Sequence, residues 1–215
     1  VYKRQVNDKP RKSSWQHSLN GVWKFIYAPT IAASIKDFYR IDLPDSNWDT
    51  ITVPSNWEIQ GFGEPIIRNI QYVFSSNPPY IDVDNPVGTY RRTFTVPRNW
   101  QEREVFLHFG SISGYARIYV NGQQVGMTKA SKTPAEFNVT NYLKEGENLL
   151  AVQIYRWHDG SYMEDQDFWR LTGIERDVFL QAYPKLTIWD FFLKSSLDST
   201  YKNGIFTVSY THLTL

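Results

Sequence analysis

The stretch Y-A-R-I-Y-V-N-G-Q-Q-V-G-M-T, residues 115–128, decides the fold class of this chain. At its centre is Asn121-Gly122, a dipeptide that favours a two-residue turn between antiparallel strands. Successive side chains of a strand point to opposite faces, so the residues before the turn divide into two sets. The set predicted to face the core is Ala116, Ile118 and Val120, and the set predicted to face outward is Tyr115, Arg117 and Tyr119. The stretch therefore predicts a β-hairpin of Tyr115–Val120 and Gln123–Thr128.

Further strands are predicted on both sides of this hairpin. They are short, rich in β-branched and aromatic residues, and bounded by Gly, Pro or Asn. The predicted strands are Val22–Ala28, Thr89–Val96, Glu104–Phe109, Glu147–Trp157 and Arg176–Tyr183. One short helix is predicted at Thr30–Tyr39, where apolar residues recur at helical spacing and Thr30 is a suitable N-cap. The pattern as a whole indicates an all-β sandwich or barrel.

Pro184 marks a predicted domain boundary. Beyond it, Leu186–Leu193 and Gly204–Tyr210 are predicted strands joined by a polar turn. Two strands do not form a stable domain by themselves. We therefore predict one β domain over residues 1–184 and the first part of a second, truncated β domain over residues 185–215.

Composition excludes several classes of function. Among the 215 residues, 23 are Lys or Arg and 22 are Asp or Glu, so a net charge of +1 attracts neither nucleic acid nor an anionic membrane. No apolar run approaches the roughly 20 residues that span a bilayer. The absence of cysteine removes disulfides and thiolate metal sites, but it suits the cytoplasm and the periplasm alike. We predict no nucleic-acid partner and no membrane partner, and the compartment stays open.

Acidic and aromatic residues are concentrated in W-H-D-G-S-Y-M-E-D-Q-D-F-W-R, residues 157–170. Carboxylates accept hydrogen bonds from hydroxyls, and flat rings cover apolar C–H faces, so this mixture suits a sugar. The carboxylates are Asp159, Glu164, Asp165 and Asp167, and the rings are Trp157, Tyr162, Phe168 and Trp169. An acidic surface loop whose rings merely pack in the core is the alternative, and spacing alone slightly favours it, because structural ion-pair networks also cluster charge.

A catalytic pair of carboxylates is not predicted here. On a strand, Asp165 and Asp167 would share a face, but Glu164 would point away. Gly160 and the lack of β-branched residues favour a loop, whereas a retaining glycosidase holds two carboxyl groups about 5 Å apart. The four histidines show no zinc-binding spacing, and no nucleophilic serine motif is present. We therefore predict no catalytic residue in this chain.

Four stretches together resemble the N-terminal part of glycoside hydrolase family 2 β-galactosidases. They are L-N-G-V-W-K-F (19–25), V-P-S-N-W-E-I-Q-G-F-G-E-P-I-I-R-N-I (53–70), V-N-G-Q-Q-V-G (120–126) and R-W-H-D-G-S-Y-M-E-D-Q-D-F-W-R-L-T-G-I-E-R-D-V (156–178). The resemblance implies a jelly-roll, galactose-binding-domain-like β-sandwich followed by a truncated immunoglobulin-like β-sandwich. It also implies a catalytic TIM barrel in the same polypeptide, which carries the acid/base and nucleophile glutamates, and a homo-oligomeric full enzyme.

Two site residues carry over from this resemblance. Asn69, in P-I-I-R-N-I, resembles an asparagine that reaches into the galactose pocket. Asp167, in E-D-Q-D-F-W, resembles an aspartate that contacts a galactose hydroxyl and helps to ligate sodium, with the remaining ligands supplied by the barrel. The magnesium of the full enzyme would have its ligands outside this chain. Lys129 stands where some relatives place a neutral side chain near a structural divalent ion, and its charge argues against that ion here.

The implied function is that of a non-catalytic N-terminal portion of a β-galactosidase. The full enzyme would hydrolyse terminal non-reducing β-D-galactose residues with retention, and this portion would wall the pocket and bind sodium weakly or not at all by itself. Without the barrel, the fragment is expected to be inactive. One alternative is a freestanding, lectin-like carbohydrate-binding module without catalysis, and another is a scaffold domain whose loops serve assembly only.

Overall fold

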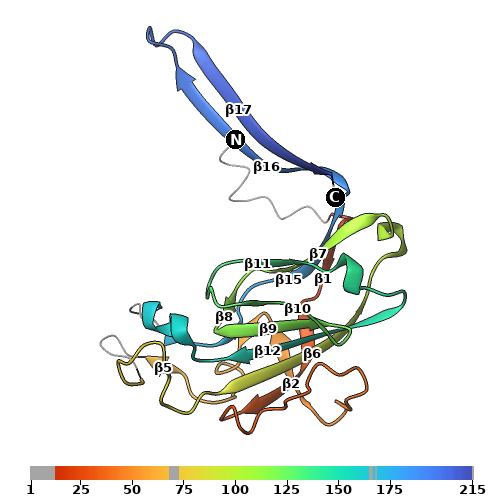
Figure 1. Ribbon diagram of the computed structural model, residues 1–215, viewed down its shortest axis with the longest axis vertical. Coiled ribbons are helices and arrows are strands. Elements are labelled where there is room, and N and C mark those ends of the chain that lie inside the picture. Colours follow the sequence, from red (N-terminus) through yellow and green to blue (C-terminus); the bar gives the residue numbers. More distant parts are fainter. Residues whose placement is uncertain (1–12, 68–72, 165–166, 168, 215) are drawn as a thin grey trace.

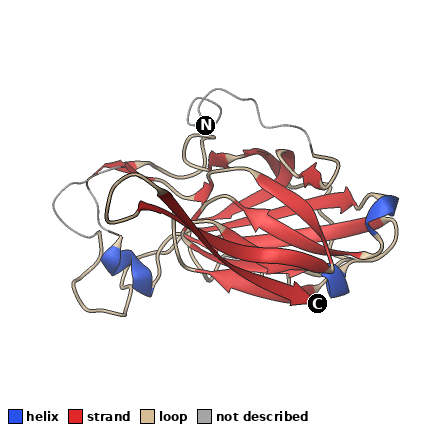
Figure 2. Ribbon diagram, turned by 90° about the horizontal axis from the view of Figure 1, so that it is seen from above, coloured by secondary structure: helices blue, strands red, loops and turns tan. Residues whose placement is uncertain are grey.

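The computed structural model describes residues 13–67, 73–164, 167 and 169–214, and the side chains of 13–67, 73–164, 167 and 169–211. Figure 1 shows a layered β structure from which one long hairpin extends. No α-helix occurs in the described ranges, where three short 3-10 helices lie at the ends of strands (Figure 2). These are η1 (Arg98–Trp100), η2 (Thr140–Tyr142) and η3 (Asp159–Met163). The prediction of an all-β sandwich is confirmed.

Two antiparallel sheets form the sandwich. The larger has the strand order β10 (Gln123–Thr128), β9 (Tyr115–Val120), β12 (Glu147–Tyr155), β6 (Val87–Thr95), β2 (Gly21–Ala28) and β3 (Asp49–Val53). The smaller has the order β1 (Gln16–Ser18), β15 (Val178–Pro184), β7 (Arg103–Phe109) and β11 (Ala135–Asn138). The bounds of β9 and β10 are those predicted, because the Asn121-Gly122 turn fixes the hairpin register locally.

Short ladders tie the connecting loops to the sandwich. β14 (Gly173–Ile174) lies between β4 (Ser55–Asn56) and β8 (Ile112–Ser113). β5 (Ile66–Ile67) pairs with β13 (Trp169–Arg170), so that two segments about 100 residues apart in sequence lie side by side.

The core between the two large sheets is rich in aromatic rings. Trp23, Phe25 and Tyr90 are each at most 1% exposed, and the Phe25 ring lies 4.7 Å from that of Tyr90. From β9, the predicted core set of Ala116, Ile118 and Val120 is fully buried. Burial of each large apolar side chain stabilises the fold by about 1.5–3 kcal/mol. This core holds the two sheets together and positions the loops at their ends.

A second, smaller cluster lies on the outer face of the larger sheet. Tyr119 points outward as predicted, but it is only 5% exposed because Phe38 and Tyr39 cover it. The predicted helix at Thr30–Tyr39 is wrong. The segment instead makes separate turns, in which the amide of Ser34 donates to the carbonyl of Ile31. Its apolar residues recur because they pack on the sheet, and not because they share a helix face.

The hairpin of β16 (Leu186–Leu197) and β17 (Gly204–Thr214) extends away from the sandwich (Figure 1). Both strands are longer than predicted, because backbone pairing continues through polar residues. The turn is organised by Asp198, whose carboxylate accepts hydrogen bonds from Thr200 and Asn203. This hairpin is the described part of the predicted second β domain, and the boundary at residue 184 stays a prediction.

Candidate functional site

Four loop segments meet at one end of the sandwich, near β5 and η3 in Figure 1. They are residues 57–67, 74–86, 129–133 and 156–174. The first three each contact the fourth, which contains the predicted sugar-binding stretch of residues 157–170. The last segment therefore organises this end of the molecule.

The 156–174 segment begins with a capped 3-10 turn. The amide of Gly160 donates to Nδ1 of His158 at 3.1 Å, and the amide of His158 donates to Oγ of Ser161 at 3.1 Å. Asp159 accepts from Nζ of Lys129 at 2.8 and 2.9 Å, and this contact lowers the pKa of its carboxyl. Asp159 is thus engaged in an ion pair and is the first residue of η3.

Glu164 ties η3 to the loop at residues 129–133. Its Oε1 accepts from the amide of Ser131 at 3.1 Å, and its Oε2 lies 3.6 Å from Nε2 of the buried His158. Burial opposes ionisation of Glu164, but the contacts with His158 and Ser131 outweigh it, so the pKa of Glu164 is lowered. Glu164 therefore serves the loop structure, which is the role that the alternative interpretation of this stretch assigns to its acids.

Two rings of the stretch also pack. Phe74 lies between Trp157 and Tyr162, with centroid distances of 5.6 and 4.9 Å. The hydroxyl of Tyr162 lies 2.6 Å from the carbonyl oxygen of Tyr80. These rings hold the 74–86 loop and are not open sugar platforms. Trp169 differs, because it is 49% exposed.

A buried ion pair underlies the site. Glu58 and Arg156 lie 3.7 Å apart, and their side chains are 0% and 5% exposed. Arg156 donates to the carbonyl oxygens of Glu64 at 3.1 Å and Arg170 at 2.9 Å, while Glu58 accepts from the amide of Thr172 at 2.9 Å. Burial raises the pKa of Glu58 and lowers the pKa of Arg156. The sequence analysis did not predict this pair. Its signal in the sequence is a charged residue beside a tryptophan, in Trp57-Glu58 and again in Arg156-Trp157.

Of the two predicted site residues, the structure describes Asp167 but not Asn69. Asp167 is exposed and lies two residues before β13, where Trp169 pairs with Ile67 of β5. Asn69 lies outside the described residues, two positions after Ile67. The structure thus brings together the segments that flank Asn69 and Asp167, and their contacts with a sugar stay predictions.

Cation binding has limited support within the described ranges. There, no three His, Asp or Glu side chains gather as a metal site. A carboxylate is a suitable ligand for a hard cation such as sodium, and the exposed Asp167 offers one. A hard cation is held by several oxygens, so Asp167 would need further ligands from elsewhere. The predictions for sodium and magnesium are therefore untested.

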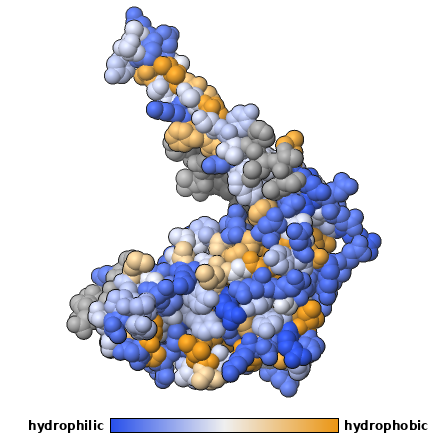
Figure 3. Space-filling model, in the orientation of Figure 1, coloured by the Kyte–Doolittle hydropathy of each residue, from blue (hydrophilic) through white to orange (hydrophobic). Residues whose placement is uncertain are grey.

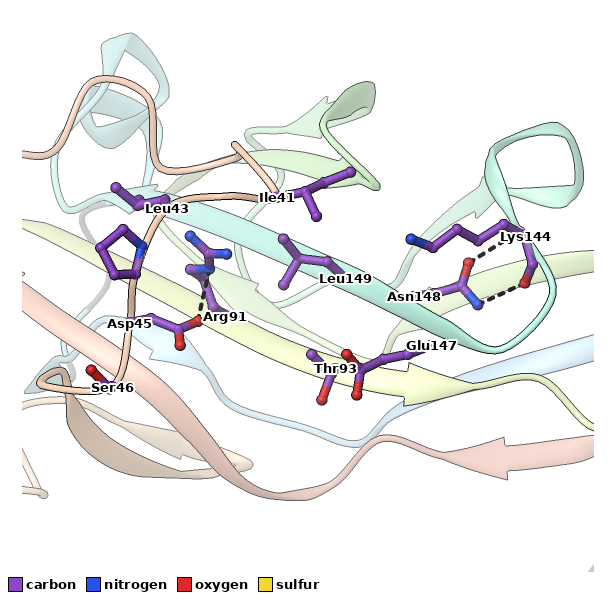
Figure 4. Close-up of a pocket in the computed structure, with 11 residues that line it drawn as sticks. Ile41, Leu43, Asp45, Ser46, Arg91, Thr93, Lys144, Glu147, Asn148 and Leu149 are labelled. Atoms are coloured by element: carbon purple, nitrogen blue, oxygen red, sulfur yellow. Dashed lines mark hydrogen bonds and ion pairs between the residues drawn. The ribbon is translucent and has the colours of Figure 1, made fainter.

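A cavity of about 380 Å³ lies on the outer face of the larger sheet (Figure 4). Arg91 and Asp45 form an ion pair of 3.1 Å in it, and Lys144 and Glu147 add a second pair of opposite charges to its lining. No aromatic side chain lines it. Without a flat ring for the C–H face of a sugar, this cavity does not match the surface expected of a lectin site.

Comparison with known proteins decides the family. Residues 16–184 match the sequence model of the glycosyl hydrolases family 2 sugar binding domain. The chain belongs to this family. It is 43% identical over 205 residues to a β-galactosidase of Priestia megaterium. The aligned region covers 93% of this chain and 20% of that relative. It is 45% identical over 189 residues to a β-galactosidase of Vibrio cholerae, and here the aligned region covers 88% of this chain and 18% of that relative. The chain thus spans about a fifth of these curated relatives.

Solved structures similar to this family 2 chain include β-glucuronidases. One from an uncultured Clostridium sp. has a TM-score of 0.70 and 25% identity, covering 95% of this chain and 35% of that protein. One from Bacteroides uniformis has a TM-score of 0.65 and 26% identity, covering 84% and 20%. These similarities agree with the sandwich fold. In the described part of the chain, no helix has the length and apolar character needed to cross a bilayer.

Proposed function

We propose that this family 2 sugar-binding domain is part of a β-galactosidase, in which it walls the galactose pocket beside a catalytic barrel of the same polypeptide. Support comes from the relatives that are 43% and 45% identical, both β-galactosidases about five times longer than the matched region. Family 2 by itself does not distinguish galactosides from other substrates, since the similar solved structures are β-glucuronidases. The galactoside specificity therefore rests on the sequence relatives.

The observation that carries this proposal is the pairing of β5 with β13 at an exposed edge. It holds the segments next to Asn69 and Asp167 side by side. Ile67 is 61% exposed and Trp169 is 49% exposed, so the same edge offers apolar area to a neighbouring domain. An edge that combines polar site residues with apolar area suits a shared wall between two domains.

The chemical contribution of this chain is to bind and orient the sugar. The carboxylate of Asp167 accepts a charge-assisted hydrogen bond from a galactose hydroxyl, and the amide of Asn69 both donates and accepts. Asp167 also supplies one oxygen to sodium, with the barrel supplying the others. Hydrolysis with retention uses two carboxyl groups about 5 Å apart, and these belong to the barrel. Assembly of the full enzyme as a homo-oligomer remains a prediction.

The test uses the full-length gene product and the two substrates 4-nitrophenyl β-D-galactoside and 4-nitrophenyl β-D-glucuronide. We expect kcat/KM to be at least about 100-fold higher for the galactoside, a difference that polar recognition of the sugar can supply. Asp167→Asn is expected to lower kcat/KM by about 10- to 100-fold and to weaken its dependence on sodium, because a charged acceptor is lost.

Preference for the glucuronide would overturn the galactosidase assignment. Wild-type kinetics of Asp167→Asn would favour a scaffold role. Micromolar binding of the isolated domain on a glycan array would favour the lectin-like alternative.

A further inference from the structure

The buried ion pair of Glu58 and Arg156 touches both of the segments that meet at the candidate site. One arm of the Arg156 guanidinium donates to the carbonyl of Glu64, two residues before β5. The other arm donates to the carbonyl of Arg170, which is the last residue of β13. A single planar side chain therefore links the strand that precedes Asn69 to the strand that follows Asp167.

Glu58 completes this link from the opposite side. Its Oε2 accepts from the amide of Thr172, while the amide of the neighbouring Trp57 donates to the carbonyl of the same Thr172. Residues 57 and 58 are thus fixed to residue 172 by two hydrogen bonds of 3.0 and 2.9 Å. Arg156 then spans the remaining gap between the two segments.

We infer that Arg156 and Glu58 are positioning residues for the glycosidase reaction, which set the spacing of β5 and β13 and so place Asp167 at the sugar. This inference rests on the function proposed above. Neither side chain touches the substrate, because both are buried beneath the loops. Their effect on the reaction passes through the exposed Asp167.

The β5–β13 ladder is too short to hold this spacing alone. It consists of two residue pairs, Trp169 with Ile67 and Arg170 with Ile66. An isolated two-stranded ribbon is at best marginally stable, and both Ile67 and Trp169 are largely exposed. The planar fork of an arginine fixes two carbonyl oxygens at a defined separation, and a lysine ammonium does not.

Burial favours a geometric role over a stabilising one. A buried ion pair is costly to desolvate and often adds less stability than apolar residues of the same volume. Glu58 also has one oxygen, Oε1, without a hydrogen-bond partner among the described residues. The gain that remains is a unique arrangement of the backbone segments that the pair connects.

Arg91 provides a matched control for Arg156. Its side chain is 3% exposed, it pairs with Asp45 at 3.1 Å, and it donates to the carbonyl of Phe38. It lies on the outer face of the larger sheet, where it holds the 37–48 region instead of the site segments (Figure 4). Arg→Lys at both positions makes the same chemical change at nearly equal burial, so any shared loss of stability cancels in the comparison.

The experiment measures KM for 4-nitrophenyl β-D-galactoside and the Kd of the non-hydrolysed isopropyl β-D-thiogalactoside, using full-length protein. Both constants are independent of the fraction of enzyme that folds. We expect Arg156→Lys to raise both at least tenfold, because a misplaced site residue weakens sugar binding. Arg91→Lys is expected to leave both within twofold of wild type. Unchanged constants in folded Arg156→Lys, or an equal rise in Arg91→Lys, would overturn the inference.

A second pair of variants decides the matter if Arg156→Lys does not fold. Glu58→Asp keeps the charge but shortens the reach to the amide of Thr172, whereas Glu58→Gln keeps the reach and removes the charge. We expect KM to rise at least threefold in Glu58→Asp and by a smaller factor in Glu58→Gln. No change in either variant, or the reverse order, would overturn the inference.

A wild-type protein that hydrolyses no galactoside would overturn the proposed function and this inference with it, whereas an active wild type with unaffected variants overturns this inference alone.

Discussion

The sandwich and the β16–β17 hairpin show what an apolar strand gains from a covering layer. In the sandwich, one face of each large sheet packs on the other sheet, and Phe25 is fully buried. In the hairpin, Phe191 and Phe192 point to opposite faces and are 60% and 66% exposed. Figure 3 shows the hydrophobic side chains along this arm. Equally apolar sequences therefore differ in stability according to what lies against them.

One ring of the hairpin packs against the sandwich. Trp189 lies 5.1 Å from the Phe106 ring and 5.8 Å from the Tyr183 ring, and it occupies the point where the β16 register shifts. Exposed apolar surface of this extent is typical of an interaction surface. If the hairpin is an arm that the sandwich does not need for its stability, four measurements should show it.

The largest expected effect comes from removing the same ring in each region. Phe25→Ala leaves a cavity beside Tyr90 and Phe62 and is expected to lower the free energy of unfolding by about 3–5 kcal/mol. Phe192→Ala removes a ring that is mostly in water, and it is expected to change the free energy by less than about 0.5 kcal/mol. Urea denaturation followed by tryptophan fluorescence measures both. Equal losses would show that the hairpin belongs to the folded core.

Two glycines test the effect of adding side-chain volume instead of removing it. A Cβ at Gly88 would lie 2.4 Å from the Trp57 ring, whereas a Cβ at Gly204 meets no atom within 4 Å. Gly88→Ala is therefore expected to destabilise the sandwich by about 1–3 kcal/mol, because a crowded core resists added volume. Gly204→Ala is expected to have little effect on the melting temperature. A neutral Gly88→Ala measured by calorimetry would mean that Trp57 moves freely, in conflict with its burial.

The contrast also explains how much the sequence predicted. The β9–β10 hairpin was predicted residue by residue because its turn chemistry is local. The helix at Thr30–Tyr39 was wrong because spacing cannot distinguish a helix face from turns that pack on a sheet. The buried pair of Glu58 and Arg156 was missed because its members are far apart in sequence, and only the fold brings them together. For Asn69 and Asp167, the structure gives the arrangement of the flanking segments, and their roles still rest on the resemblance.

A smaller effect is expected at the junction between the regions. Trp189→Ala removes the ring that packs on Phe106 and Tyr183, so the arm should move more freely while the sandwich stays intact. We expect faster trypsin cleavage at Lys185, with the free energy of unfolding of the sandwich lowered by about 1 kcal/mol or less. Phe191→Ala, on the same strand, is the control and should leave the cleavage rate unchanged. Equal cleavage rates in wild type and Trp189→Ala would show that other contacts hold the arm.

The smallest expected effect is a difference in pKa shift between one carboxyl of the sandwich and one carboxyl of the hairpin. Burial in the sandwich raises the pKa of Glu58, whereas hydrogen bonds from Thr200 and Asn203 lower the pKa of Asp198 in the hairpin turn to about 2. The stabilising contribution of Glu58 is present below its unfolded pKa and is lost as pH rises through the folded value. That of Asp198 is present above its unfolded pKa and is lost as pH falls through about 2. Carbon-detected NMR titration should therefore find Glu58 above and Asp198 below the usual value of each acid. An ordinary value for Asp198 would mean that the turn is not formed in solution, because without its hydrogen bonds an exposed carboxyl has no cause for a shift.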